Sequence, residues 1–338
     1  MKAPSIKDIA ESLGVSKTLV SLVLNKRAEE YGISPETQKK VLNKAKELNY
    51  KPNRLAQGLR LGKSKIIGLV VADISNPFYS KISRHIEDLV DKKGYNLIIC
   101  NSDENEKKER KIIQTLLERH VDGLIVTSTC MQPEEINQLN NENIPFVLVD
   151  RYMKDVKTNY VGVDNFNGAY NAVVHLVKKG CRQIGNITVT PTYISSLEDR
   201  KKGFLAAIKD YKINYNPGFD LLIPYENLES DLEKSLKKLF GGKQVPDGLF
   251  IANNKLAVES LKNFKKLGVR IPDDILLVCF DDIPLYEFFP APINAVAQPI
   301  YDICRETVEI LFSEINDSKR PSELERKSVI LPAELIIR

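Results

Sequence analysis

The chain has 338 residues, of which 43% are hydrophobic and 28% are charged, and its formal net charge is +4. This is the composition of a soluble globular protein, and the length provides for two or three domains with a sizeable core. No apolar run approaches the roughly 20 residues of a transmembrane helix, and the first residues lack the apolar stretch of a signal peptide. We therefore expect a cytoplasmic protein with no membrane partner.

The charge is unevenly distributed along the chain. Residues 1–62 carry 12 Lys and Arg against 6 Asp and Glu, whereas the remainder carries 37 against 39. A basic segment on a nearly neutral body is typical of a protein that meets a polyanion. A lysine-rich, solvated helix face would give the same count, so charge alone leaves both interpretations open.

The cysteines and histidines suggest neither a metal site nor a cofactor. The cysteines are widely separated and form no CxxC motif, which favours reduced thiols packed in the core: Cys100, Cys130, Cys181, Cys279 and Cys304. The 3 histidines lie in helix-like segments rather than at strand ends. We expect no catalytic residue, no bound metal and no cofactor.

Residues 1–50 have the pattern of short helices with clear start and stop signals. Apolar residues at helical spacing over 6–13 predict a first helix, and Gly14 permits a tight turn after it. Ser16 is a good N-cap for a second helix, and Ser34-Pro35 marks the start of a third. A short joint between the first two helices predicts a helix-turn-helix unit.

A helix-turn-helix unit places its second helix in the major groove of DNA. Lys17 has the chemistry to donate to guanine or phosphate, and Thr18 to contact a base or a thymine methyl. Ser16, Ser21 and Asn25 are polar residues suited to phosphate contacts. Leu22 is apolar on the outward face; it either contacts a thymine methyl or packs on a neighbouring helix or the linker.

The segment 51–63 is predicted to be a linker when alone. Pro52 breaks the preceding helix, and residues 54–60 have room for two helical turns that contain Gly58. A helix this short is marginal in water and becomes ordered only when something holds it.

From Lys65 onward, apolar runs alternate with amphipathic helical segments. The runs include IIGLVVAD, YNLIICNS, VDGLIVTST, IPFVLVDR, NYVGVD, QIGNITV, DLLIPY, DGLFIAN, DILLVCFDD and INAVAQP. Strands that are apolar on both faces and alternate with helices predict parallel sheets in α/β layers. This number of strands exceeds one comfortable sheet, so we expect two lobes with a cleft between them. Ligands of such sheets bind beyond the carboxyl ends of the strands.

These motifs together resemble the LacI family of bacterial transcription regulators. The resemblance covers IKDIAESLGVSKTLVSLVLN and YKPNRLAQGLR in the head, and in the body GLVVADISNPFYSKISRHIEDLV, VGVDNFNGAYNAVVHL, DRKKGFLAAI, LFIANN and GVRIPDDILLVCFDD. It implies an all-α helix-turn-helix head at 1–50, a hinge at 51–63 and a periplasmic-binding-protein-like core at 64–338. Within the core we expect an N-lobe at about 64–162 plus 294–324 and a C-lobe at about 163–293 plus 325–338.

The resemblance also implies the partners and their contacts. It implies a nucleoid-associated homodimer that grips a palindromic operator in double-stranded DNA. In the family a hinge leucine wedges into the minor groove, and here that residue is Leu59, with Arg54 at the phosphate backbone. The alternative for Leu59 is packing of the hinge on its own protein.

A small-molecule effector, most simply a carbohydrate, is implied for the cleft. The residues that match the family's effector-binding positions are Phe78, Asp150, Ser196, Arg200, Asn253 and Asp281. An aromatic ring, carboxylates, an amide and an arginine suit a polyhydroxylated ligand. Asp150 or Asp281 would alternatively serve only to cap a helix.

The sequence departs from the family pattern at three places, so neither operator nor effector is copied from a relative. Asn254 replaces a commonly acidic residue, Leu22 stands where Arg, His or Phe is frequent, and the loop at 26–34 is longer than usual.

The function that we predict is that of a regulator, most simply a repressor of carbohydrate-use genes. Catalytic motifs such as GxSxG or a P-loop are absent from the sequence, so we do not expect an enzyme. Two alternatives remain open: a regulator controlled by a protein partner, and a sugar-binding module without operator specificity.

Overall fold

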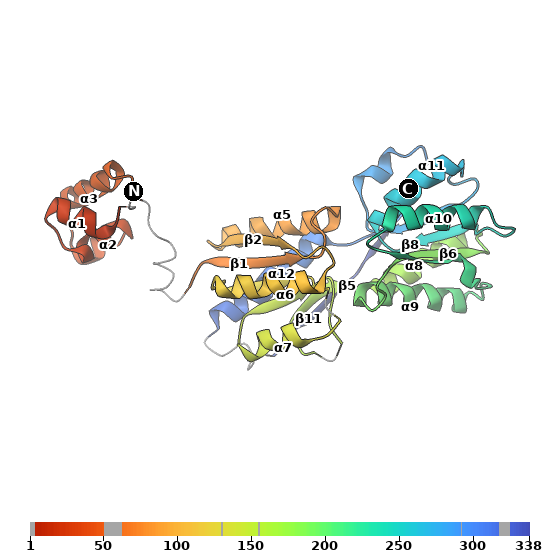
Figure 1. Cartoon of the computed structure of the whole chain (residues 1–338), viewed down its shortest axis with the longest axis horizontal. Helices are drawn as coiled ribbons and strands as arrows, with labels where there is room; N and C mark the ends of the chain where they lie inside the picture. The colour runs from red at the N-terminus through yellow and green to blue at the C-terminus, as the bar shows by residue number, and fades with distance from the viewer. Residues whose placement is uncertain (1–3, 51–62, 130, 155, 292, 318–324) are drawn as a thin grey trace. The chain divides into compact units, whose positions relative to one another are not determined.

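The computed structural model describes residues 4–50, 63–129, 131–154, 156–291, 293–317 and 325–338. The chain divides after Ser64 into two compact units, a head and a core, and Figure 1 shows the elements of each. The residues predicted for the hinge, Arg54 and Leu59, lie outside the described residues. So do four of the basic residues of the first segment, Lys2, Lys51, Arg54 and Arg60.

The head consists of helices α1 (Ile6–Leu13), α2 (Lys17–Leu24) and α3 (Pro35–Glu47), with a 3-10 turn at Glu29–Tyr31. Helices α2 and α3 begin at the predicted caps, Ser16 and Ser34, whereas α1 begins at Ser5, which was not predicted. The Leu19 amide donates to Ser16 Oγ over 3.1 Å, and Gly14 adopts the left-handed conformation with a φ of 67° that glycine permits. The helices enclose a small core of the following residues: Ile9, Ala10, Val20, Val23, Ala28, Val41 and Ala45.

The N-lobe of the core is a six-stranded parallel sheet in the order β11-β5-β4-β3-β1-β2. Its strands are β1 (Ile66–Val71), β2 (Asn96–Asn101), β3 (Gly123–Val126), β4 (Phe146–Val149), β5 (Tyr160–Val163) and β11 (Ser328–Leu331). Apolar side chains cover both faces of this sheet, which is why its strands read as continuous apolar runs. One face packs against α5 (Pro77–Lys92) and α12 (Ile300–Asn316), and the other against α6 (Glu106–Glu118) and α7 (Glu134–Asn141).

The C-lobe repeats this design with the order β12-β10-β9-β8-β6-β7. Its strands are β6 (Ile184–Thr190), β7 (Asp220–Pro224), β8 (Gly248–Ile251), β9 (Leu276–Phe280), β10 (Asn294–Ala297) and β12 (Glu334–Ile336). Helices α8 (Asn165–Lys178) and α9 (Ser195–Asp210) cover one face, and α10 (Leu228–Phe240) and α11 (Asn254–Leu267) cover the other. Strand β12 pairs antiparallel with β10, so the otherwise parallel sheet has one reversed strand.

The predicted lobe boundaries near 294 and 325 are wrong by one strand each. We expected the segment from 294 in the N-lobe, but β10 pairs with β9 of the C-lobe. We expected the segment from 325 in the C-lobe, but β11 pairs with β5 of the N-lobe. The chain therefore crosses between lobes after β5, after β10 and after β11. The apolar pattern identifies each strand, but it carries no information on which sheet completes the hydrogen bonds.

Candidate functional site

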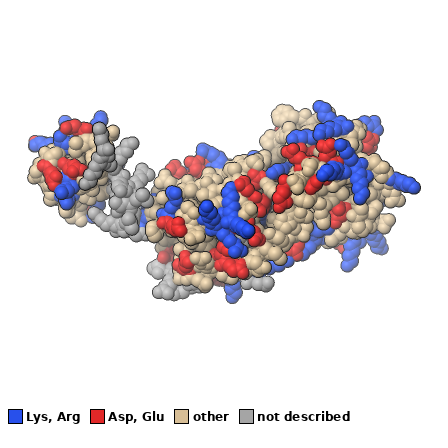
Figure 2. Space-filling model, in the orientation of Figure 1, with Lys and Arg blue, Asp and Glu red and all other residues tan. Residues whose placement is uncertain are grey.

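The outward face of α2 presents the predicted DNA contacts. Asn25 is tied back to the helix, because its Nδ2 donates to the Ser21 carbonyl over 2.8 Å. Leu22 is half-buried, yet it is not among the apolar side chains packed on the core of the head. The exposed members of the predicted set are Ser16, Lys17, Thr18 and Asn25, and the half-buried members are Ser21 and Leu22. Figure 2 shows acidic and basic side chains intermixed on the visible face of the head.

In the core, all six predicted effector residues line one cavity between the lobes. The cavity has a volume of about 50 Å³, which is room for water but not for a sugar. The lobes are therefore closed upon each other at this cavity, and Phe78, Asp281 and Gln298 also line a neighbouring cavity of about 380 Å³. Further residues line the same cavity and were missed from the sequence: Asp73, Asn76, Tyr79, Glu104, Arg151, Val189, Leu197, Tyr225, Lys255 and Gln298.

Three of the six predicted residues follow the carboxyl ends of strands. Asp150 follows β4 and Asp281 follows β9, and both adopt positive φ, 67° and 72°. Such a backbone is uncommon outside glycine and tends to be retained where a side chain must be aimed at a site. Asn253 follows β8, and its Oδ1 accepts from the Leu256 amide over 2.8 Å. Asn253 thus caps α11, whereas Asp150 and Asp281 are not the N-cap of any described helix.

Arg200 is a buried cation held rigidly by α9. Its Nε donates to Asn165 Oδ1 over 2.8 Å, and its Nη1 donates to the Ala252 carbonyl over 2.7 Å. Its guanidinium carbon lies 3.6 Å from the centroid of the Phe280 ring, a close cation–π contact. A guanidinium has five N–H donors, so further donors remain for a ligand.

The N-lobe side of the cavity places a carboxylate beside a paired arginine. Tyr79 Oη donates to Asp150 Oδ2 over 2.9 Å. Arg151 binds Glu104 through two hydrogen bonds of 2.7 and 2.6 Å. Burial raises the pKa of Asp150 despite the opposing fields of Arg151 and Arg200. Among the described residues, the Asp150 carboxylate accepts a single hydrogen bond, from Tyr79.

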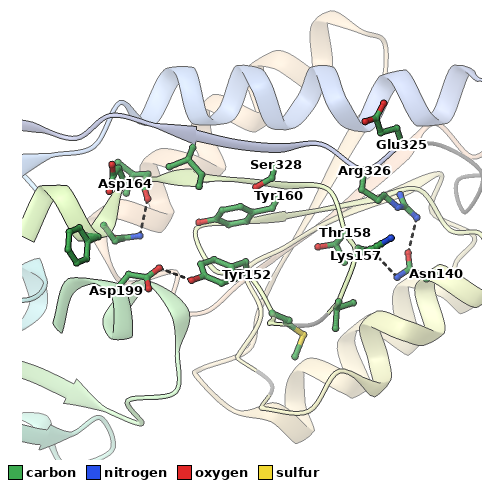
Figure 3. A pocket seen from close by; sticks show the side chains of 16 residues that line it. Asn140, Tyr152, Lys157, Thr158, Tyr160, Asp164, Asp199, Glu325, Arg326 and Ser328 are labelled. Carbon is green, nitrogen blue, oxygen red and sulfur yellow. Dashed lines mark hydrogen bonds between the residues drawn. The ribbon is translucent and has the colours of Figure 1, made fainter. Parts of the chain in front are cut away.

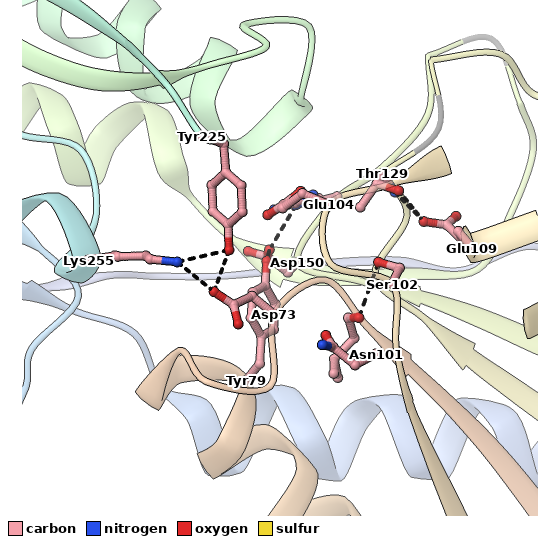
Figure 4. Close-up of polar contacts among 12 residues, drawn as sticks. Asp73, Tyr79, Asn101, Ser102, Glu104, Glu109, Thr129, Asp150, Tyr225 and Lys255 are labelled. Atoms are coloured by element: carbon pink, nitrogen blue, oxygen red, sulfur yellow. Dashed lines mark hydrogen bonds and ion pairs between the residues drawn. The ribbon is translucent and has the colours of Figure 1, made fainter. Parts of the chain in front are cut away.

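A group of three residues, which we call the clasp, joins the lobes at the cavity (Figure 4). Asp73 of the N-lobe accepts a hydrogen bond from Tyr225 Oη and, over 3.1 Å, an ion pair from Lys255 Nζ, both of the C-lobe. Burial alone would raise the pKa of Asp73, but hydrogen bonds from Ser75, Tyr225 and Lys255 hold it below its ordinary value. Next to the clasp, Asn254 Nδ2 donates to Asn76 Oδ1 over 2.8 Å.

A larger cavity of about 1030 Å³ is lined by none of the six predicted residues (Figure 3). Several of its polar side chains are already engaged with each other. Tyr152 Oη donates to Asp199 Oδ2 over 2.8 Å, and Arg326 donates to Asn140 Oδ1 over 2.8 Å while also pairing with buried Glu314. The small cavity is the better candidate because the strand ends and the buried charges converge on it.

Among the residues that the structure describes, no group of three or more His, Cys, Asp or Glu side chains is placed to hold a metal ion. Within the same residues, no helix has both the length and the apolar character needed to cross a membrane.

Some of the missed cavity residues lie just beyond strand ends, as Asp150, Asn253 and Asp281 do. Asp73 follows β1, Glu104 follows β2, and Gln298 comes directly after β10. A systematic reading of every strand end would have found these three. Lys255 instead lies in the first turn of α11, and only the approach of the lobes brings it to Asp73.

Comparison with known proteins relates both units to one family. Residues 5–53 match the family described as bacterial regulatory proteins, lacI family, and residues 173–338 match the periplasmic binding protein-like domain. The ribose operon repressor of Halalkalibacterium halodurans is 34% identical over 334 residues, which are 99% of this chain and 96% of that protein.

Two solved structures extend the comparison to the fold. The lac repressor dimer bound to operator and the anti-inducer ONPF matches with a TM-score of 0.84, covering 100% of this chain and 98% of that one, at 22% identity. A LacI family transcriptional regulator from Enterococcus faecium with bound ribose matches with a TM-score of 0.68 at 26% identity, over 81% of this chain and 97% of that one. The chain therefore belongs to the lacI family of bacterial regulatory proteins.

Proposed function

We propose that this protein is a transcriptional repressor that binds a palindromic operator as a homodimer and is controlled by a sugar in the cleft between its lobes. The observation that carries the proposal is the convergence of all six predicted effector residues on one buried cavity. The head supports the operator-binding part of the proposal, because α2 begins at the Ser16 cap and presents Lys17 and Thr18 to solvent. The relatives named above, a ribose operon repressor and a regulator with bound ribose, support a sugar as the effector.

The coupling follows from the position of the cleft. A sugar in the cavity changes the balance between open and closed lobes, because it contacts both lobes only when they are closed. The hinge at 51–63 joins the N-lobe to the head, so a change in the lobes of two subunits alters the spacing of the two hinges. Leu59 and Arg54 belong to this proposal as the minor-groove wedge and a phosphate contact.

The first test is selection of duplexes from a randomised DNA pool at two salt concentrations. Enrichment of a palindrome that survives the higher salt supports a dimeric operator binder. Binding only at low salt and without a consensus reports the phosphate contribution alone and contradicts operator recognition. Repeating the measurement on the selected duplex with and without D-ribose, D-xylose and D-glucose tests control by a sugar.

Exposed apolar side chains of the core support the homodimer. Phe288 is 81% exposed and Leu285 is 42% exposed in the 3-10 segment Pro284–Phe288. Leu222 and Ile99 are exposed on β7 and β2, the strands that end their sheets among the described residues. Surfaces of this kind are typical of subunit contacts.

The homodimer is tested by sedimentation of the full chain. We expect Phe288→Ser to raise the dimer dissociation constant by at least about ten-fold, because burial of a Phe side chain is worth about 1.5–3 kcal/mol. Met131→Ser is the matched control, since Met131 is 59% exposed and lies in the N-lobe away from that segment. A monomeric wild type would contradict the homodimer.

A further inference from the structure

The cavity between the lobes is richer in negative than in positive charge. Its lining contains four carboxylates and three cations. The carboxylates are those of Asp73, Glu104, Asp150 and Asp281, and the cations are Arg151, Arg200 and Lys255. A ligand that brings further negative charge into this buried space must therefore be compensated by cations that are still available.

Two of the three cations are already neutralised by carboxylates. Arg151 forms a bidentate pair of hydrogen bonds with Glu104, of 2.7 and 2.6 Å. A phosphate that bound Arg151 in this way would have to displace the Glu104 carboxylate. Lys255 is held by Asp73, and its Nζ also lies 3.1 Å from Tyr225 Oη. A phosphate or carboxylate on the ligand would have to break one of these pairs and leave a buried carboxylate without its partner.

The third cation, Arg200, faces neutral partners but sits among carboxylates. Its two hydrogen bonds go to the carbonyl oxygens of Asn165 and Ala252. Arg200, Asp150 and Asp281 line the same cavity, and the charges of Arg200 and Asp281 both act on Asp150. An anion on the spare donors of Arg200 would meet the repulsion of both carboxylates.

The carboxylates themselves require donors. Among the described residues Asp150 accepts one hydrogen bond, from Tyr79, besides a longer ion pair of 3.6 Å with Arg151. Asp281 accepts from Gln298 Nε2 over 2.6 Å and from the Asn254 amide over 3.3 Å. A carboxylate offers about four lone-pair directions, so both have capacity left. Sugar hydroxyls supply such donors, whereas a phosphate dianion supplies none.

We infer that the cleft selects an uncharged, free monosaccharide and discriminates against its phosphorylated and carboxylic-acid counterparts. This inference rests on the proposed function, since it concerns the same ligand site. Phe78 and Tyr225 line the cavity from opposite lobes, so the lining includes an aromatic residue of each lobe beside the polar groups.

The experiment is isothermal titration calorimetry on the full chain with matched pairs of compounds. The pairs are D-ribose, D-xylose, D-fructose and D-glucose, each against its own 5- or 6-phosphate, with D-ribonate and D-gluconate as the acids. We expect at least one free sugar to bind at least about ten-fold more tightly than its charged counterparts. Equal or tighter binding of a phosphate or an acid would overturn the inference and leave a sugar-controlled repressor intact. Failure of every compound to bind would overturn the sugar effector of the proposed function, and this inference with it.

A charge variant tests the physical cause. Glu104→Gln removes the carboxylate that occupies Arg151, so the phosphate affinity should rise by about ten-fold relative to the affinity for the free sugar. The control is Glu87→Gln, which breaks a surface pair with Arg84 on α5 and should leave the ratio unchanged. An unchanged ratio in folded E104Q protein would overturn the role of the Arg151–Glu104 pair. Since the wild-type comparison needs no variant, it decides the inference even if E104Q does not fold.

Discussion

The head and the cleft use polar side chains in opposite ways. On α2, Lys17 and Thr18 are exposed on a short helix whose core is small, and both face solvent. In the cleft the polar residues are buried or half-buried and are engaged with one another, Asp73 and Asn76 with partners across the closed lobes and others within one lobe. The exposed side chains of the head therefore need no rearrangement to reach a partner. A ligand at the proposed cleft, by contrast, has to replace hydrogen bonds and ion pairs that the cleft residues make with each other. We therefore expect ligand binding at the proposed cleft to accompany a change in lobe arrangement.

This comparison predicts that the largest single effect comes from the cleft. Arg200→Ala removes charge-assisted hydrogen bonds to the ligand, each worth about 1.5–3 kcal/mol, so we expect sugar affinity to fall by more than about 100-fold. The loss also leaves Asn165 Oδ1 and the Ala252 carbonyl without a donor, which should lower the free energy of unfolding by about 2–4 kcal/mol. Calorimetric titration and thermal unfolding measure the two effects.

Arg305→Ala is the matched control for that variant. Arg305 lies on the surface of α12 and pairs with Asp302 and Glu306. Its removal should change neither quantity appreciably, because exposed ion pairs contribute little. Wild-type sugar affinity in R200A would show that Arg200 does not contribute to ligand binding.

The second-largest effect that we expect is a loss of operator affinity. Leu59→Ala should weaken operator affinity by about 10- to 100-fold while leaving sugar affinity unchanged, because a wedge that unstacks a base step acts on DNA alone. Fluorescence anisotropy with the selected duplex measures the first quantity and calorimetry the second. Leu61→Ala in the same segment is the control. Equal operator affinity for L59A and the wild type would contradict the hinge contact.

A smaller effect is expected at a single exposed residue of the head. Lys17→Ala should reduce operator affinity by about ten-fold. If Lys17 contacts a phosphate, its loss lowers the slope of log affinity against log salt concentration by about one. If Lys17 contacts a guanine, its loss instead relaxes the sequence preference. Lys7→Ala is the control, since Lys7 is also exposed but lies on α1, where it pairs with Glu11. If K7A and K17A behaved alike, α2 would not be the reading helix.

The two regions also differ in how far the sequence predicts them. The head follows from local signals, because Ser16, Gly14 and Ser34 each start or stop a helix through contacts within a few residues. In the cleft, the strand-end rule locates Asp150 and Asp281, since a strand and its following residue are neighbours in sequence. It does not show that Lys255 reaches Asp73, because that contact joins residues 182 positions apart.

The errors in lobe assignment have the same physical origin. Strands β10 and β11 exchange sheets relative to our expectation, although both were within segments assigned to the core. The sheet that a strand joins depends on which neighbouring strand forms its backbone hydrogen bonds. When that neighbour is far away in the chain, the local hydrophobic pattern does not indicate it. Only a three-dimensional arrangement supplies this information.

The smallest predicted effect tests whether closure of the cleft is part of its affinity. Tyr225→Phe keeps the ring that lines the cavity but removes the hydroxyl that donates to Asp73. Because the clasp stabilises the closed lobes, its loss should shift the population towards the open form and weaken sugar binding by about three- to ten-fold. Tyr211→Phe, on an exposed tyrosine at the end of α9, is the control. The weakening should appear mainly as faster sugar dissociation in stopped-flow measurements, since the clasp forms after entry. An unchanged dissociation rate would mean that the clasp does not hold the ligand-bound lobes together, and the cleft would then resemble the head in binding as it stands.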